Sequence, residues 1–142
     1  MDTYADRHIE PEDIEIFHQI ERVIDDLIVP NLGVDDEGRK IELSCHMLAE
    51  VIEEIFGLKR INGYFMTGYY HSWLVTTNQN IIDVYPVGTI GRPLLIARQI
   101  IHKQGPIYIE DKNLDLGQSK PSYKKSLELV RVAVYESIIK TL

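Results

Sequence analysis

The sequence predicts an α+β domain in which helices pack on one face of a small antiparallel sheet. Apolar residues recur at helical spacing towards both ends of the chain, whereas the middle is rich in aromatic and β-branched residues punctuated by glycine. The resulting order of helix, helix, antiparallel strands and helix is typical of this class. With 142 residues, of which 44% are hydrophobic, the chain has the length and apolar content of one globular domain. We therefore expect residues 1–142 to form a single domain.

Three helices are predicted. An amphipathic pattern that begins at a proline predicts the first over residues 11–28. Ser44 is a suitable N-cap for a second helix over residues 45–56, which Gly57 would end. Ser122 is expected to cap the third, which runs almost to the last residue. The polar connector between the first two helices is too short to separate two domains.

The strands are predicted in the middle of the chain and after it. Residues 69–85 indicate a β-hairpin whose turn lies at residues 78–80. An alternating pattern over residues 106–110 predicts an edge strand, and the polar residues 111–120 predict a loop. Residues 94–103 fit a strand or a short helix equally well.

The register of this hairpin decides whether His71 and Asp83 can meet. Side chains alternate between the two faces of a sheet, so a shift of one residue moves one of the pair to the other face. A three-residue loop at 77–79 puts His71 opposite Tyr85 and makes Asp83 its diagonal neighbour, about 7–8 Å away and within reach of the side chains. A two-residue loop at 78–79 separates the two residues.

Charge and cysteine content exclude several classes of function. The formal net charge of -7 gives no electrostatic footprint for nucleic acid or anionic lipid. No uncharged apolar stretch approaches the ~18 residues of a membrane span, and the first residues lack the pattern of a secretory signal. The single cysteine cannot form an intramolecular disulfide. We therefore expect a cytoplasmic protein with no nucleic-acid and no membrane partner, and leave secretion without a signal open.

Cys45, His71 and Asp83 are the candidate catalytic residues. Cys45 falls in the first turn of a predicted helix, where backbone N–H groups stabilise a thiolate. His71, on a strand, could act as its base, and Asp83 lies among apolar residues, where a carboxylate needs a partner. The alternative interpretations are a buried inert thiol, a histidine satisfied within the sheet and a surface carboxylate.

Five short segments between about residue 40 and residue 86 form an ordered pattern. They are Ser44-Cys45-His46-Met47-Leu48-Ala49-Glu50-Val51, Phe56-Gly57-Leu58, Gly63-Tyr64, His71-Ser72-Trp73-Leu74 and Ile81-Ile82-Asp83-Val84. The pattern resembles the transglutaminase-like branch of the papain-fold cysteine enzymes. This resemblance implies a papain-like or transglutaminase-like fold and thiol-protease-like chemistry. It further implies Cys45 as nucleophile, His71 as general base and acid, and Asp83 as the residue that orients His71.

The oxyanion hole departs from the pattern of these enzymes. Arg39 stands six residues before Cys45, where papain-like peptidases usually carry a glutamine that donates to the oxyanion. The Arg-Gly-Gly-x-Cys signature of arylamine acetyltransferases and the tryptophan that precedes the cysteine of large transglutaminases are absent. The backbone N–H groups of Cys45 and His46 could hold an oxyanion, and Gln19, Asn31 or Arg39 could supply a second donor.

The leading hypothesis is a cysteine-dependent hydrolase, such as a peptidase or deamidase, or an acyltransferase. Its substrate would be an amide, ester or thioester in a peptide, a protein or a small molecule. The alternative is a non-catalytic module of the same fold that binds a peptide or protein. Trp73 shares a strand face with His71 and is expected to cover it or to contact the substrate. A metal site of Cys45, His46, His71 and Asp83 is disfavoured because adjacent helical residues diverge, so no metal or cofactor is expected.

Overall fold

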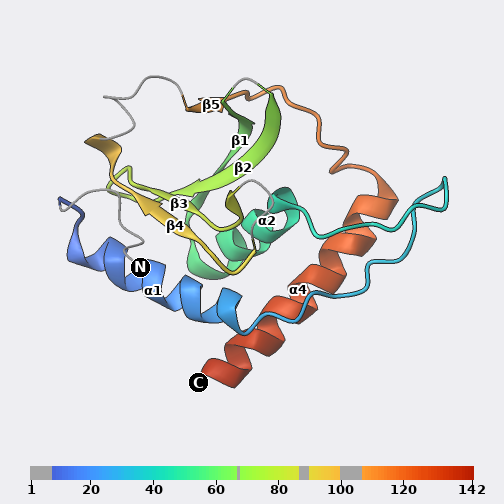
Figure 1. Ribbon diagram of the computed structural model, residues 1–142, viewed down its shortest axis with the longest axis horizontal. Helices are drawn as coiled ribbons and strands as arrows, with labels where there is room; N and C mark the ends of the chain where they lie inside the picture. Colours follow the sequence, from blue (N-terminus) through green and yellow to red (C-terminus); the bar gives the residue numbers. More distant parts are fainter. Residues whose placement is uncertain (1–7, 67, 87–89, 100–106) are drawn as a thin grey trace.

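The chain forms an α+β fold in which helices cover one face of an antiparallel sheet (Figure 1). This computed structural model describes residues 8–66, 68–86, 90–99 and 107–142. Their elements are, in chain order, α1 (Pro11–Asp25), α2 (Cys45–Phe56), β1 (Lys59–Phe65), β2 (Tyr69–Val75), β3 (Ile81–Asp83), β4 (Leu94–Ile96), β5 (Tyr108–Glu110) and α4 (Pro121–Thr141). The sheet has the strand order β4–β3–β2–β1–β5. The predicted α+β class is confirmed.

Local signals explain the bounds of α2. The Ser44 hydroxyl accepts the Met47 backbone N–H over 3.2 Å, which satisfies one of the donors that every helix start leaves unpaired. Gly57 ends the helix in the left-handed conformation at φ 70°, which glycine adopts without the penalty a side chain brings. The predicted cap, helix and stop are all confirmed.

The bounds of the other two helices differ from prediction. α1 ends at Asp25 and not at residue 28, because Pro30 disfavours helical backbone just before it and the 64% exposed Ile28 has little packing to hold a further turn. The predicted Ser122 cap is wrong. Lys120 is the N-cap of α4 and Pro121 occupies N1, where a proline loses no helical hydrogen bond.

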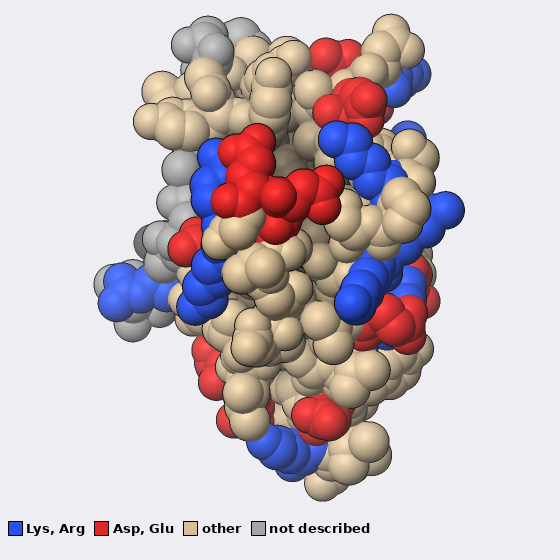
Figure 2. All heavy atoms as spheres, turned by 90° about the vertical axis from the view of Figure 1, so that its right-hand side faces the viewer, with Lys and Arg blue, Asp and Glu red and all other residues tan. Residues whose placement is uncertain are grey.

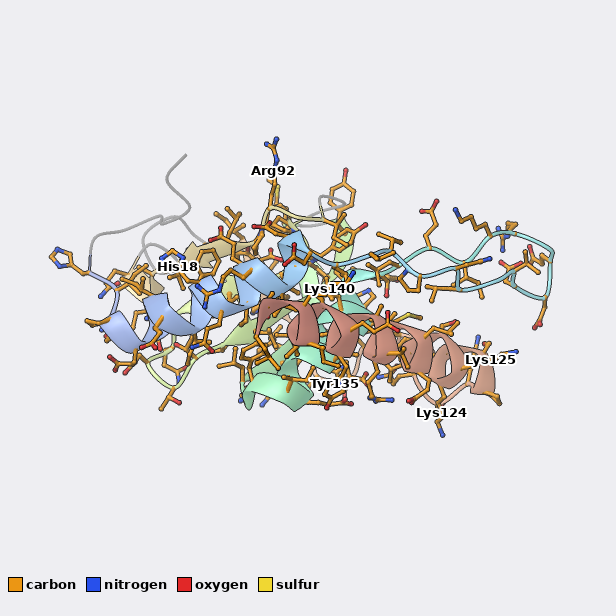
Figure 3. The ribbon with its side chains drawn as sticks, turned by 90° about the horizontal axis from the view of Figure 1, so that it is seen from below. His18, Arg92, Lys124, Lys125, Tyr135 and Lys140 are labelled. Carbon is orange, nitrogen blue, oxygen red and sulfur yellow. The ribbon has the colours of Figure 1, made fainter. Side chains whose placement is uncertain are left out.

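The main hydrophobic core lies between the helices and one face of the sheet. That face presents Leu74, Ile82 and Leu95 to buried residues of the helices, among them Phe17, Ile52 and Val130. Helices α1 and α4 lie side by side, joined by a hydrogen bond from the Ser137 hydroxyl to the Val23 carbonyl, and Lys124 and Lys125 project outwards from the start of α4 (Figure 3). The opposite face of the sheet carries a smaller cluster built on Ile61, Trp73 and Ile81. Because side chains alternate along a strand, His71 belongs to this second face.

The β2–β3 hairpin has the register that lets His71 and Asp83 meet. Leu74 pairs with Ile82, and Val75 pairs with Ile81. The Thr76 N–H donates to the Asn80 carbonyl over 2.9 Å, which leaves a three-residue loop at 77–79. The loop ends on Gln79 at φ 70°, as three-residue hairpin loops commonly do. Of the two loops that the sequence leaves open, the structure has the three-residue one.

A buried carboxylate in α1 holds the hairpin loop. Asp13 is 1% exposed, and it accepts hydrogen bonds from the Thr76 hydroxyl at 2.6 Å and the Asn80 amide at 2.7 Å. The Asn80 amide also donates to Glu10 over 2.8 Å. A two-residue loop would carry these donors away from α1 and leave a buried charge poorly paired, which is costly. The polar contacts to α1 therefore select the register.

The last two strands complete the sheet. Of residues 94–103, Leu94–Ile96 form strand β4, Arg98 and Gln99 are helical, and residues 100–103 lie outside the described residues. β5 pairs with β1 as an edge strand, as predicted, while Pro106 also lies outside them. The pairing depends on Gly63, because a Cβ there would lie 1.9 Å from the Ile109 carbonyl oxygen. None of the described helices is long and apolar enough to cross a membrane.

Between α1 and α2 the chain forms a projecting arm, residues 27–44 (Figures 1 and 3). An isolated bridge between Val34 and Lys40 ties its outgoing and returning halves together. At its tip Arg39 pairs with Asp35 at 3.2 Å and with Glu37 at 2.8 Å. Acidic and basic side chains accordingly lie side by side on this face (Figure 2). The acidic run is a solvated turn, as its sequence suggests.

Candidate active site

Cys45 is the first residue of α2 and is partly exposed. No acidic side chain occupies the first turn of this helix, residues 45–48, so the positive end of its dipole is left for the thiol. The N–H groups of Cys45 and His46 lie too early in the helix to bond within it. The cysteine therefore combines access to solvent with local stabilisation of a thiolate.

His71 and Asp83 form a buried pair on the second face of the sheet. His71 Nε2 lies 2.8 Å from Asp83 Oδ2, and the two side chains are 2% and 0% exposed. Asp83 also accepts the Tyr108 hydroxyl on Oδ2 at 2.8 Å and the Tyr85 backbone N–H on Oδ1 at 3.2 Å. A carboxylate with these partners is fixed in orientation, and it fixes the imidazole in turn.

The second nitrogen of the His71 ring, Nδ1, is left for Cys45. Burial disfavours the charged form of His71, but hydrogen bonds to Asp83 and Cys45 outweigh it and raise the pKa of His71 to about 9. Burial likewise opposes ionisation of Cys45, yet hydrogen bonds to His46 and His71 lower the pKa of the thiol to about 6. Near neutral pH the pair is therefore a thiolate beside an imidazolium. The structure brings together the three residues that the sequence singled out.

The side chain of His46 gives the thiol a second imidazole neighbour. His46 Nδ1 lies 2.6 Å from the Ser72 hydroxyl, and this hydroxyl donates to Asn62 Oδ1 over 2.6 Å. Since the hydroxyl has one proton and gives it to Asn62, the His46 ring donates its Nδ1–H to Ser72. Sequence reasoning considered His46 for its backbone N–H and as a disfavoured metal ligand, and it missed this chain of hydrogen bonds.

Aromatic rings enclose the imidazole of His71. The Trp73 ring lies 6.1 Å away, centroid to centroid, with the two planes inclined by 25°. Phe65 and Tyr108 approach at 5.9 and 6.2 Å. Trp73 is 3% exposed, so it covers His71 as expected and offers little surface to a substrate. These rings keep water from His71 and hold its orientation.

The suggested second oxyanion donors lie in different surroundings. Arg39 is engaged with acidic residues at the tip of the arm. Asn31 accepts the Gly33 N–H at 3.0 Å through its side-chain oxygen. Gln19 is part of α1, and among the described residues no hydrogen bond joins it to Cys45. A role for Gln19 stays a prediction, and the donors adjacent to the thiol are the two backbone N–H groups.

Two hollows are lined by neighbours of the candidate residues. A groove of about 970 Å³ lies at the base of the arm and reaches Leu43 and Tyr85. A smaller, polar pocket of about 390 Å³ is lined by His46, Tyr70 and Lys120. The lining of each hollow includes a residue within two positions of Cys45 or Asp83.

Tyr108 is the main residue of the site that sequence reasoning missed. The alternating pattern around it predicts a strand, but the pattern does not say which strand lies next to it. Its role depends on the β1–β5 pairing of Phe65 with Tyr108, a contact between distant parts of the chain.

Among the described residues, no group of three or more histidine, cysteine, aspartate or glutamate side chains is arranged to hold a metal ion.

Comparisons with models of protein families, with curated proteins and with solved structures find no match to this chain.

Proposed function

We propose that this protein is a cysteine-dependent acyl-transfer enzyme with a papain-like or transglutaminase-like fold. Cys45 is the nucleophile, His71 the general base and acid, and Asp83 the residue that orients His71. The observation that carries the proposal is the buried His71–Asp83 pair, whose second imidazole nitrogen is directed to a partly exposed thiol at a helix N-terminus. The substrate is an amide, ester or thioester of a peptide, a protein or a small molecule.

The first half-reaction forms an acyl-enzyme. The Cys45 thiolate attacks the carbonyl carbon, a carbon–sulfur bond forms, and the carbonyl oxygen takes the displaced electron pair. The N–H groups of Cys45 and His46 stabilise this oxyanion. As the intermediate collapses, the bond to the leaving amine, alcohol or thiol breaks and the His71 imidazolium gives its proton to the leaving group. Asp83 stabilises the imidazolium throughout the attack.

The second half-reaction releases the acyl group. A water or an amine attacks the thioester, and His71, now neutral, accepts its proton. The thiolate leaves and the imidazolium is restored, so the ion pair is regenerated. Water gives a hydrolase and an amine gives a transferase. A thiolate that is ionised at neutral pH oxidises readily, and we propose a reducing compartment such as the cytoplasm as the site of action.

Trapping the acyl-enzyme tests this proposal. The protein is mixed with p-nitrophenyl acetate, and intact and peptide mass spectrometry locates the acetyl group. We expect stoichiometric acetylation of Cys45 with a burst of p-nitrophenol, no burst with Cys45→Ala, and a burst slowed by about 10²–10⁴-fold with His71→Ala. A wild-type rate equal to that of a free cysteine peptide, unchanged by His71→Ala, would overturn it.

The same experiment addresses the alternative function as a binding module. Tyr69 and Tyr70 at the start of β2 are 59% and 63% exposed, an unusual amount for aromatic side chains on a strand. A slow reaction that does not depend on His71 would favour binding of a peptide through one of these exposed rings.

A further inference from the structure

The groove at the base of the arm is the largest described hollow next to the candidate nucleophile. It holds about 970 Å³, within the range of sites that bind small organic molecules. Its walls come from both halves of the arm and from the segment that follows β3. The apolar side chains among them are Val29, Pro30, Val34, Ile41, Leu43 and Ile90.

Two residues of the lining connect the groove with the candidate active site. Leu43 lines it and lies two positions before Cys45. Tyr85 lines it as well, and the backbone N–H of Tyr85 donates to Asp83. Burial raises the pKa of the Tyr85 hydroxyl, and the negative charges of Cys45 and Glu42 raise it further. A molecule in the groove would therefore contact a residue two positions from Cys45 and a residue bonded to Asp83.

The lining selects the chemistry of the occupant. Val29 and Val34 are 55% and 65% exposed, so an apolar ligand would remove them from water. The two charged side chains of the lining, Lys40 and Glu42, have opposite signs and give no net preference for a charged ligand. The pocket lined by His46 contains Asp115 and Lys120 and is more polar than the groove.

We propose that the groove binds an uncharged, extended apolar part of the substrate, such as an alkyl chain, next to the carbonyl group that Cys45 attacks. That the groove binds part of a substrate rests on the proposed function, whereas its preference for apolar chains does not. Burial of the apolar chain in the groove supplies binding energy that the thiol alone does not provide. It also positions the substrate carbonyl relative to Cys45.

Alkylation of Cys45 by a series of N-alkyl iodoacetamides, from methyl to octyl, tests the proposal without turnover. A fully buried methylene is worth about fourfold in affinity, and we expect the second-order rate to rise about two- to fourfold per methylene in the partly open groove. Probes of equal length that end in a carboxylate or an amine should react at least about tenfold more slowly than the octyl probe, since binding in the groove would move their charge from water into apolar surroundings.

Variants of exposed residues provide the controls. Val34→Asp should remove most of the dependence of the alkylation rate on chain length. Val132→Asp, a matched change at a 49% exposed position on α4 away from the groove, should leave the whole series unchanged. Thermal unfolding of each variant checks that it is folded.

The outcomes separate this proposal from the proposed function. Rates that are independent of chain length, or a dependence that Val34→Asp and Val132→Asp reduce alike, would overturn the groove assignment. If long probes remain faster and Val34→Asp cancels the effect while Cys45 reacts as an ordinary thiol, the groove assignment stands and the proposed enzymatic function fails.

Discussion

Tyr108 and His71 share one oxygen of Asp83. The Tyr108 hydroxyl donates to Oδ2 over 2.8 Å, and His71 Nε2 lies 2.8 Å from the same atom. Burial raises the pKa of Tyr108, and the negative charge of Asp83 raises it further, so the hydroxyl keeps its proton. Two donors therefore compete for the negative charge that stabilises the imidazolium of His71.

Tyr108→Phe should strengthen the remaining interaction between Asp83 and His71. The carboxylate loses one donor, so more of its charge acts on the imidazolium, and the pKa of His71 should rise further. The free energy of unfolding should fall by about 1–3 kcal/mol because a buried hydrogen bond is lost. NMR titration of the His71 ring and urea unfolding measure the two effects. Tyr69→Phe, at a 59% exposed tyrosine, is the control and should change neither. A pKa of His71 that falls in Tyr108→Phe would contradict this account.

Gly63→Ala should separate β5 from β1. The new Cβ would lie 1.9 Å from the Ile109 carbonyl oxygen, a backbone atom that moves only with its strand. We expect a loss of about 2–4 kcal/mol in the free energy of unfolding, together with the shift in the pKa of His71 that Tyr108→Phe produces. A Cβ at Gly68 would meet nothing within 4 Å, so Gly68→Ala serves as the control. Equal stability of the two variants would show that β5 does not pack as described.

His46→Ala should change the ionisation of Cys45 without removing the base. Hydrogen bonds to both His46 and His71 lower the pKa of the thiol to about 6, so losing one of them should move it up towards its ordinary value of 9.0. Alkylation at pH 6 should slow by about tenfold for each unit of that rise, while the rate at pH 9 stays within a few-fold of wild type. Loss of acylation at all pH values would instead identify His46 as the base.

The Cys45–His71 pair should leave stability nearly independent of pH across a wide window. The pKa of His71 is raised from its ordinary value of 6.5 to about 9 in the folded protein. The stabilisation that His71 contributes is therefore complete below pH 6.5 and is lost as the pH rises through 9. The contribution of Cys45 is full above 9.0 and lost as the pH falls through about 6. Between pH 6.5 and 9 the two pH dependences of stability cancel. In that range the folded chain carries its proton on His71 and the unfolded chain carries one on Cys45, so both states hold the same number of protons.

Two measurements separate ionisation from stability. The ultraviolet absorbance of the thiolate, absent in Cys45→Ala, should reach half its maximum near pH 6. The free energy of unfolding in urea should change by less than about 1 kcal/mol between pH 6.5 and 8.5 on account of this pair. A half-maximum near pH 9 would mean that the ion pair does not form.

Sequence patterns predict the parts of this molecule that depend on neighbouring residues. Ser44 and Gly57 act within one turn of the helix they bound, so α2 and the place of Cys45 follow from local signals. The sequence predicts the hairpin but leaves open whether its loop has two or three residues, and only the three-residue loop lets His71 and Asp83 meet. Asp13 meets that condition from a position 63 residues away from Thr76, which no local pattern records.

The rest of the site depends on contacts between distant segments. Tyr108 reaches Asp83 because β5 pairs with β1, and the His46 chain of hydrogen bonds exists because β1 and β2 place Asn62 beside Ser72. Alternation along a strand indicates which side chains share a face, but it does not identify the neighbouring strand. Those residues therefore became visible only in the fold.

The rate of Cys45 alkylation by iodoacetamide as a function of pH tests the central claim most directly. In the wild-type protein we expect the rate to stay close to its maximum above about pH 7 and to fall to half of it near pH 6. In His71→Ala the midpoint should move up by at least about one unit, since the imidazolium that stabilises the thiolate is gone. A wild-type midpoint near the ordinary pKa of the thiol, 9.0, and unaffected by His71→Ala, would contradict the account.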